Sequence, residues 1–351
     1  MHTFPRPMGI KHSKIASAIT AVAILSGNAS AFTAREVTVF NQPAGITLAG
    51  TLTAPGDGER VRGVIVMATG SGTQDRDETL FGHKPFKVIA ENLSDAGYAV
   101  LRMDDRGAGG SEGDPSTAVT DDFVTDVLAG LGYARELYPG VQAGIIGHSE
   151  GGTIAVKAAA GNTGVSFIIT IGCPALPGDS LIMSQMRALS RGATGNDDAY
   201  HKNRALQRQL LDIVKSAMPA SIKRARMSML ICDTMPAEAA IPQVRKQIDS
   251  QIDGMLTPWY IAYMRYDPAG DIASVSVPWL AFNGALDLQV TPDNLDIIKC
   301  NPNATTVLMP QHNHLLQRCT TGMPDEYARI SQTIDPEAIA TMIQWLGTVC
   351  E

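Results

Sequence analysis

The stretch that decides the fold is Gly144-Ile145-Ile146-Gly147-His148-Ser149-Glu150-Gly151-Gly152-Thr153-Ile154-Ala155-Val156. Its apolar start predicts a short buried strand, Gly144–Ile146, and the small apolar residues Glu150–Ala160 predict a helix. Between them, glycines on both sides allow Ser149 the strained backbone of a sharp strand-to-helix turn. Such a turn lifts the hydroxyl above a sheet edge, at a helix amino terminus that favours developing negative charge. Ser149 is therefore the candidate nucleophile.

A second Gly-x-Ser-x-Gly match occurs earlier in the chain, at Gly109–Gly113. It follows the loop Asp104–Gly107 and precedes Asp114-Pro115, with no strand directly before it and no helix directly after it. The nucleophile turn needs both of those neighbours. We therefore interpret this match as a glycine-rich loop.

Apolar strands and helices alternate around the Ser149 turn, which predicts a mostly parallel, doubly wound sheet covered on both faces. The further strands are predicted at Val64–Ala68, Tyr98–Met103, Phe167–Ile171, Val277–Phe282 and Thr305–Met309. The further helices are predicted at Phe86–Ala96, Asp121–Leu137 and Pro292–Cys300, with a last one opening at Asp335-Pro336. Before them, Glu36–Phe40 and Ile46–Thr53 predict an antiparallel hairpin.

Residues 175–269 interrupt this alternation with a Met-, Arg-, Lys- and Gln-rich segment of helical spacing and no convincing strand. Because the segment lies between two predicted strands, we expect a helical cap over the loops of the sheet rather than a separate helical domain. The core is then 32–174 and 270–351, and the cap is 175–269. The methionines of the cap can line an adaptable apolar pocket or form a plain helical core.

A serine hydroxyl is a poor nucleophile without a base, so the histidines decide whether Ser149 can react. Residues 32–351 contain His83, His148, His201, His312 and His314. His148 adjoins the nucleophile and is expected to point away from it, His201 lies in the insertion, and His83 lies in an early loop. His312 and His314 follow the last predicted strand, where the base belongs in the chain order Ser, acid, His. Of these two, we prefer His314.

The acid is expected after the strand Val277–Phe282, where Asp287 lies a short loop beyond the carboxyl end. Asp287 would fix the tautomer of the base and stabilise its protonated form. Asp179, after the preceding strand, is the alternative. The loop after Val64–Ala68 is rich in glycine, so its backbone can approach a substrate closely. We assign the oxyanion donors to the N–H groups of Ser71, or Gly72 in its place, and Glu150.

These residues together resemble the α/β-hydrolase superfamily, and more closely the bacterial serine esterases grouped with the serine aminopeptidase-like (S33-type) hydrolases. The stretches that carry the resemblance are Ile46–Leu52, Gly70–Gly72 with Gln74–Asp77, Asp104–Gly107, Gly147–Gly152, Asn283-Gly284 with Asp287, and Asn313–Leu315. The resemblance implies an α/β-hydrolase fold with a helical cap insertion, hydrolysis of short acyl esters through an acyl-enzyme, and no cofactor. Thr69-Gly70 departs from the His-Gly common in the family, so we expect the support of this loop to differ.

Two other functions remain open. The same three residues, Ser149, Asp287 and His314, could serve a peptidase, an amidase or an acyltransferase. A non-catalytic binding protein on the same fold is the third hypothesis, because fold does not imply function. The intact set of three residues weighs against that hypothesis.

Length, composition and net charge limit the classes of partner that the protein can have. The chain has 351 residues, 44% hydrophobic and 18% charged, which is ordinary for a globular protein. The net charge of -7 argues against nucleic acid or an anionic membrane as the main partner. We expect a small-molecule ester as partner, and the sequence leaves the oligomeric state open.

The amino-terminal segment has the pattern of a signal peptide. Three basic residues precede the apolar run Ile15–Leu25, and Ala29-Ser30-Ala31 is a small-x-small cleavage site. The run is too short to span a bilayer. We expect cleavage after about Ala31, export to the periplasm or the medium, and no stable membrane insertion afterwards.

Export to an oxidising compartment would allow disulfides. The chain contains Cys173, Cys232, Cys300, Cys319 and Cys350, so at least one thiol is left over. No CxxC or Cys/His ligand spacing is present, so no metal site is expected. Cys300 with Cys319 is the favoured pair.

Overall fold

The computed structural model describes residues 32–161 and 164–350. The expected signal peptide and its cleavage site, residues 1–31, lie outside the described residues. In the described part of the chain, no helix is long and apolar enough to cross a membrane. Within the same residues, no group of three or more His, Cys, Asp or Glu side chains could hold a metal ion.

One eight-stranded sheet organises the core, in the order β1-β2-β4-β3-β5-β6-β7-β8. The strands are β1 (Phe32–Asn41), β2 (Ile46–Pro55), β3 (Gly63–Ala68), β4 (Tyr98–Met103), β5 (Gln142–His148), β6 (Phe167–Ile171), β7 (Trp279–Gly284) and β8 (Ala304–Met309). β2 pairs antiparallel with β1 and β4, and all other neighbours are parallel. The predicted mostly parallel sheet with an amino-terminal antiparallel hairpin is confirmed.

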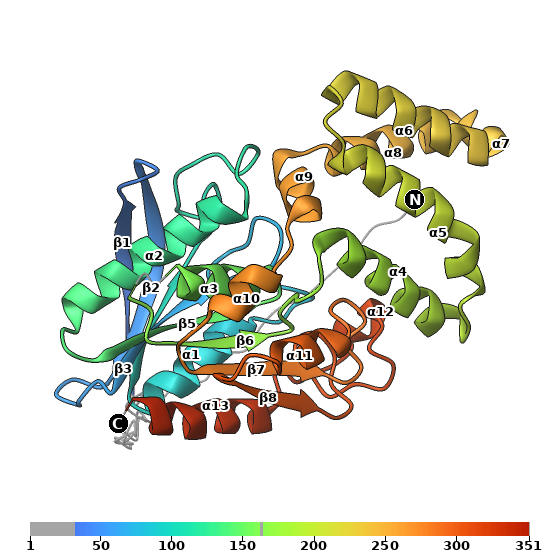
Figure 1. Ribbon diagram of the computed structural model, residues 1–351. Coiled ribbons are helices and arrows are strands. Elements are labelled where there is room, and N and C mark those ends of the chain that lie inside the picture. The colour runs from blue at the N-terminus through green and yellow to red at the C-terminus, as the bar shows by residue number, and fades with distance from the viewer. Residues whose placement is uncertain (1–31, 162–163, 351) are drawn as a thin grey trace, which may run out of the picture. The chain divides into compact units, whose positions relative to one another are not determined.

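Helices cover both faces of this sheet (Figure 1). The helices of the core are α1 (Pro85–Asp95), α2 (Thr120–Leu137), α3 (Glu150–Ala160), α10 (Ala269–Ser274), α11 (Asp293–Ile298), α12 (Pro324–Tyr327) and α13 (Pro336–Val349). Side chains of α1 and α13 share one apolar cluster with the sheet, and side chains of α2, α3, α10 and α11 share another. Strands β3 to β7 are buried along their whole length or nearly so, as strands covered on both faces must be.

Six helices separate β6 from α10 and form the predicted helical insertion. They are α4 (Gly178–Thr194), α5 (Asp198–Lys215), α6 (Ala220–Thr234), α7 (Pro236–Ala239), α8 (Pro242–Met255) and α9 (Pro258–Arg265). They have an apolar cluster of their own, in which Leu211, Met227 and Ile252 are fully buried. Met183 and Met264 are buried in the same cluster, whereas Met229 is exposed. The methionines therefore serve mainly as a helical core.

Several details differ from the sequence analysis. α11 is shorter than the predicted helix Pro292–Cys300, and α10, which follows the insertion and packs on α3, was not predicted. The pairing of Cys300 with Cys319 is wrong, because both thiols are free. Cys300 precedes β8, whereas the N–H of Cys319 donates to the carbonyl of Gln311 beyond the other end of that strand. A strand of this length, roughly 20 Å, exceeds the distance that a disulfide joins.

The apolar cluster of the insertion predicts that replacing one methionine of α6 greatly lowers the free energy of unfolding, whereas replacing a nearby methionine hardly changes it. Met227→Ala in α6 removes a fully buried side chain and should lower the free energy of unfolding by about 2–5 kcal/mol. Met229→Ala on the same helix removes a side chain that is 64% exposed, and should change it by less than about 0.5 kcal/mol. Denaturant unfolding of both variants checks this, and equal effects would contradict the assignment of the cluster.

Candidate active site

Ser149 occupies the turn between β5 and α3 with φ +54° and ψ −121°, a region that non-glycine residues rarely adopt. Its N–H donates to the carbonyl of Ile171 over 2.8 Å, and its carbonyl accepts from the N–H of Gly152 over 2.8 Å. A Cβ on Gly147 would lie 2.0 Å from the carbonyl oxygen of Gly151. The strand and helix can approach this closely only because position 147 is glycine. The predicted strained turn is therefore present at Ser149.

His314 and Asp287 form a buried pair in the loops that follow β8 and β7. The Nδ1 atom of His314 lies 2.6 Å from Oδ2 of Asp287, and the two residues are 4% and 1% exposed. The other carboxylate oxygen of Asp287 accepts the N–H groups of Gln289 and Val290, each over 2.9 Å. The N–H of His314 donates to the hydroxyl of Tyr327 over 3.2 Å. With Nδ1 directed at Asp287, Nε2 of His314 is the nitrogen left to accept a proton.

The end of β6 brings this pair and Ser149 together. The carbonyl of Ile171 accepts the N–H of Ser149, and Gly172 is the next residue. A Cβ on Gly172 would lie 2.7 Å from the ring of His314 and 3.2 Å from Oδ2 of Asp287. The three residues selected from separate strand ends in the sequence thus gather around one backbone position.

The alternative base and acid have other partners. The ring of His312 lies 2.5 Å from the carbonyl oxygen of Pro310 through Nδ1 and 2.9 Å from Asp335 through Nε2. Both of its nitrogens are therefore occupied away from Ser149. Asp179 begins α4 and forms an ion pair with Lys215 in the insertion. Neither residue shares the Asp287–His314 contact.

The second Gly-x-Ser-x-Gly segment is a loop, as interpreted. The Oγ atom of Ser111 donates to the carbonyl of Asp104 over 2.7 Å and accepts the N–H of Ala49 over 3.0 Å. The hydroxyl of Ser111 therefore fastens this loop to the end of β4 and to β2.

The loop after β3, residues 69–79, lies against the nucleophile. A Cβ on Gly70 would be 3.2 Å from the Cβ of Ser149. Ser71 follows, and its side chain is hydrogen-bonded to the carboxylate of Glu150. This places the backbone of residues 70 and 71 beside the helix amino terminus at Glu150. The roles of the Ser71 (or Gly72) and Glu150 N–H groups as oxyanion donors remain predictions.

The side chain of Glu150 joins three parts of the chain. It is 3% exposed and accepts the hydroxyl of Thr120 over 2.7 Å and the indole N–H of Trp259 over 2.8 Å. Burial raises its pKa, against the opposing effect of its hydrogen bonds to Thr120, Trp259 and Ser71. Because Trp259 belongs to α9, this carboxylate ties the insertion to the residue after the nucleophile. The sequence analysis predicted neither partner.

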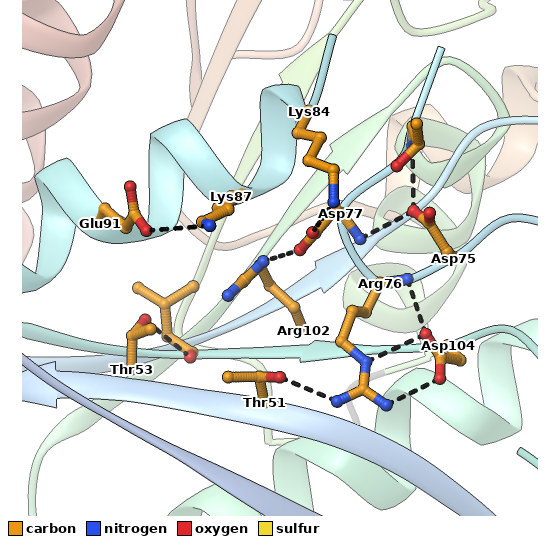
Figure 2. A network of polar contacts seen from close by, with 12 residues as sticks. Thr51, Thr53, Asp75, Arg76, Asp77, Lys84, Lys87, Glu91, Arg102 and Asp104 are labelled. Atoms are coloured by element: carbon orange, nitrogen blue, oxygen red, sulfur yellow. Dashed lines mark hydrogen bonds and ion pairs between the residues drawn. The ribbon is translucent and has the colours of Figure 1, made fainter. Parts of the chain in front are cut away.

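Ion pairs hold the same loop on the end of β4, as Figure 2 shows. The guanidinium of Arg76 contacts both carboxylate oxygens of Asp104, over 3.0 and 2.8 Å, and its backbone N–H adds a third bond over 2.9 Å. Asp77 pairs with the buried guanidinium of Arg102 and, over 3.1 Å, with Lys84. The Gln74–Asp77 stretch that carried part of the resemblance is thus the support of the loop.

Thr69, where the resemblance leads one to expect histidine, has its own support. Its hydroxyl donates to Oδ1 of Asp105 over 2.6 Å, and the N–H of Gln74 donates to Oδ2 over 2.9 Å. Desolvation raises the pKa of Asp105 from an ordinary value of 3.8 to about 7, although both hydrogen bonds oppose the shift. Asp105 therefore joins the start of the loop, at Thr69, to its middle, at Gln74.

His148 lies within the site, although the sequence analysis gave it no part there. Its ring packs against the ring of His314, with centroids 4.6 Å apart. Nδ1 lies 2.8 Å from Oε1 of Glu78, and Nε2 lies 3.1 Å from the carbonyl oxygen of His314. Both nitrogens are occupied, so His148 is no candidate for the base. Only its position beside Ser149 could have suggested it from the sequence.

Comparison with known proteins shows which family the chain is similar to. The family model described as serine aminopeptidase, S33 matches residues 84–253. Over 322 residues, 90% of this chain and 68% of the relative, the chain is 24% identical to the esterase EstD of Thermotoga maritima. The chain has the α/β-hydrolase fold and is similar to this family over the matched residues.

Solved structures of other α/β hydrolases share its fold. The esterase Pf2001 of Pyrococcus furiosus has a TM-score of 0.56 at 16% identity, covering 90% of this chain and 91% of that one. Est1E of Butyrivibrio proteoclasticus, solved with ferulic acid, has a TM-score of 0.56 at 17% identity, covering 89% and 99%. Because the sequence identities are this low, these comparisons show only that the folds are similar.

The raised pKa of Asp105 predicts a pH dependence of stability. Between about pH 4 and 7 the native protein keeps a proton that the unfolded chain has lost, so this group makes the free energy of unfolding fall as pH rises. The full effect of three pH units is at most about 4 kcal/mol. Asp105→Asn removes it, so the variant should lose less stability than the unmodified protein between these two pH values.

Urea unfolding at both ends of this range checks the prediction. Asp57→Asn, at an exposed position of the β2–β3 connection, is the matched control. The same pH dependence in Asp105→Asn and in the unmodified protein would show that Asp105 titrates normally.

Proposed function

We propose that this protein is a serine hydrolase that cleaves carboxylic esters with short acyl groups through an acyl-enzyme. The observation that carries the proposal is the 2.6 Å contact between His314 and Asp287 beside the strained turn of Ser149. A nucleophile, a base and a group that orients the base are the three parts that acyl transfer to serine requires.

In the first half of the reaction, the Oγ atom of Ser149 attacks the ester carbonyl while Nε2 of His314 takes its proton. Asp287 holds Nδ1 of His314 and stabilises the imidazolium that forms. The N–H groups of Ser71 and Glu150 donate to the oxyanion of the tetrahedral intermediate. The bond between carbon and the alcohol oxygen then breaks, and His314 gives its proton to the leaving alcohol.

In the second half, water attacks the acyl-enzyme and His314 takes a proton from it. A second tetrahedral intermediate collapses, the bond to Ser149 breaks, and His314 returns the proton to the serine oxygen. The carboxylic acid leaves and the enzyme is restored. No cofactor enters any of these steps.

The relatives support an ester more than an amide as the substrate. EstD and Pf2001 are named esterases, and Est1E was solved with ferulic acid, a carboxylic acid. The matching family model carries the description of an aminopeptidase, so amide hydrolysis is the second candidate. Amides need stronger protonation of the leaving group, so rates on an ester and an anilide of the same acid separate the two.

An apolar pocket beside the site supports a small acyl group. It has a volume of about 200 Å³ and is lined by Gly72 and Thr73 of the loop after β3, by Pro115, Ser116, Ala118 and Phe123, and by Thr257 and Trp259 of the insertion. Trp259 bonds to Glu150, and Gly72 follows Ser71, so the pocket adjoins the expected oxyanion donors. An apolar cavity of about 150 Å³ holds benzene, so this pocket suits a short acyl chain or a single ring.

The deciding experiment measures hydrolysis of p-nitrophenyl acetate, butyrate and octanoate by residues 32–351 and by Ser149→Ala. We expect turnover that falls at least about a thousandfold in Ser149→Ala, because no other group supplies the nucleophile. We also expect a fluorophosphonate adduct on Ser149 in the folded protein. Turnover that survives in Ser149→Ala, or a folded protein with neither turnover nor adduct, would refute the proposal.

The pocket predicts opposite changes in chain-length preference for two variants. Ala118→Leu fills it and should reduce kcat/KM for butyrate relative to acetate about tenfold, whereas Phe123→Ala enlarges it and should favour octanoate by a similar factor. Ala328→Leu, at an exposed position, is the control. The same variants are also measured on acetate esters of different alcohols. If the variants change the preference among these alcohols but not the preference among acyl chain lengths, the pocket binds the alcohol part of the ester.

We further propose that the protein acts after export. The support is the sequence pattern of residues 1–31, with its basic start, apolar run and Ala29-Ser30-Ala31. Protein recovered from outside the cytoplasm should begin at about Phe32. A chain found only in the cytoplasm would contradict the proposal.

A further inference from the structure

Two buried side chains with titratable groups lie beside the site, and neither takes part in the proposed proton transfers. Glu78 is 1% exposed and His148 is 4% exposed. The Oε1 atom of Glu78 lies 2.8 Å from Nδ1 of His148 and also accepts the N–H of Gly70 over 2.7 Å. On its other side, the ring of His148 reaches the carbonyl oxygen of His314 through Nε2 over 3.1 Å. A continuous chain of bonds thus runs from the loop after β3 to the base.

The partners of His148 determine where its protons are. A carbonyl oxygen only accepts, so Nε2 must carry a hydrogen to bond to His314. A carboxylate also only accepts, and Oε1 of Glu78 already accepts from Gly70, so Nδ1 must carry a hydrogen as well. Both bonds together require the imidazolium form of His148. Glu78 then supplies the compensating negative charge that a buried cation needs.

A small cavity beside Glu78 and His148 is otherwise lined by apolar residues: Pro85, Phe86, Ile89, Ile171, Leu315 and Ile334. The titratable groups near the pair are His314 and Asp287 on the side of the base, and Asp105 on the side of the loop. Burial alone would lower the pKa of His148, but the charge and hydrogen bond of Glu78, with the His314 carbonyl, outweigh burial and raise it.

Glu78 is held in an unusual backbone conformation, with φ +52°. Its N–H donates to the carbonyl of Asp75 over 2.9 Å, within the loop that Arg76 and Asp77 fasten to the end of β4. A non-glycine residue with a positive φ is strained and is retained only where the surrounding structure holds it in place. Such residues cluster at functional sites. The loop is therefore built to direct this carboxylate inward.

We propose that the Glu78–His148 ion pair is a positioning bridge that sets the oxyanion loop and the base loop relative to each other on either side of Ser149. This inference rests on the proposed function. Glu78 fixes the amide of Gly70, next to the expected donor Ser71, and His148 fixes the backbone of His314. Neither side chain touches the reacting atoms. The bridge acts on kcat, because small displacements of an oxyanion donor or a base weaken transition-state contacts most.

The test compares Glu78→Gln, His148→Phe and the double variant with matched exposed controls, Glu59→Gln and His201→Phe. We expect kcat on p-nitrophenyl butyrate to fall about 10- to 100-fold in each single variant, with KM changed less than about threefold. The double variant should be no slower than the slower single variant, because both changes break one bridge. The pH profile of kcat/KM should also change in the single variants and stay unaltered in the controls.

The bridge and the proposed function can be refuted separately. If the unmodified protein shows Ser149-dependent turnover and the folded variants keep its kcat and pH profile, the bridge is refuted and the proposed function stands. If the unmodified protein shows no Ser149-dependent turnover, the proposed function fails.

If the variants do not fold, a measurement on the unmodified protein still tests the ion pair. Nitrogen NMR of ring-labelled histidines at about pH 7.5, above the ordinary histidine pKa of about 6.5, counts rings that carry two protons. We expect the ring of His148 to be among them, because both of its nitrogens face acceptors. A neutral His148 at this pH would refute the ion pair.

Discussion

The turn at Ser149 constrains much of the surrounding structure. A serine with φ +54° is strained, and the strain is held by bonds on both sides, to Ile171 and to Gly152. The close approach of β5 and α3 excludes any side chain at Gly147. The same bond to Ile171 fixes Ser149 to the end of β6, where Gly172 lies against His314. The geometry of the site therefore follows from how tightly one strand and one helix pack.

Buried carboxylates then place the loops around this turn. Asp287 holds His314, Glu150 holds the first turn of α3, and Asp104 and Asp105 hold the loop after β3. Each of them accepts hydrogen bonds from at least two groups. A buried charge without such partners would be strongly destabilising, so each carboxylate fixes its donors in position. These hydrogen bonds join the loops around Ser149 to one another.

The insertion is joined to the core at several points, among them the bond between Trp259 and Glu150 and a 2.8 Å bond between Ser184 and Thr291. It has its own apolar cluster, yet Trp259 of α9 bonds to Glu150 and lines the apolar pocket beside the oxyanion loop. A change in the insertion can therefore alter the pocket without disturbing Ser149, His314 or Asp287.

The sequence by itself determined the sheet, the amino-terminal hairpin and the helical insertion, because alternating apolar segments report burial locally. It also selected Ser149, Asp287 and His314, since each follows a predicted strand and parallel strands end at one edge. The tertiary structure alone decided the rest. Glu78 lies 70 residues from His148, and Trp259 lies 109 from Glu150, so no local pattern joins them. Cys300 and Cys319 are separated by a strand despite their nearness in the chain. Periodicity records which faces are buried, whereas hydrogen bonds between distant side chains depend on how the elements pack.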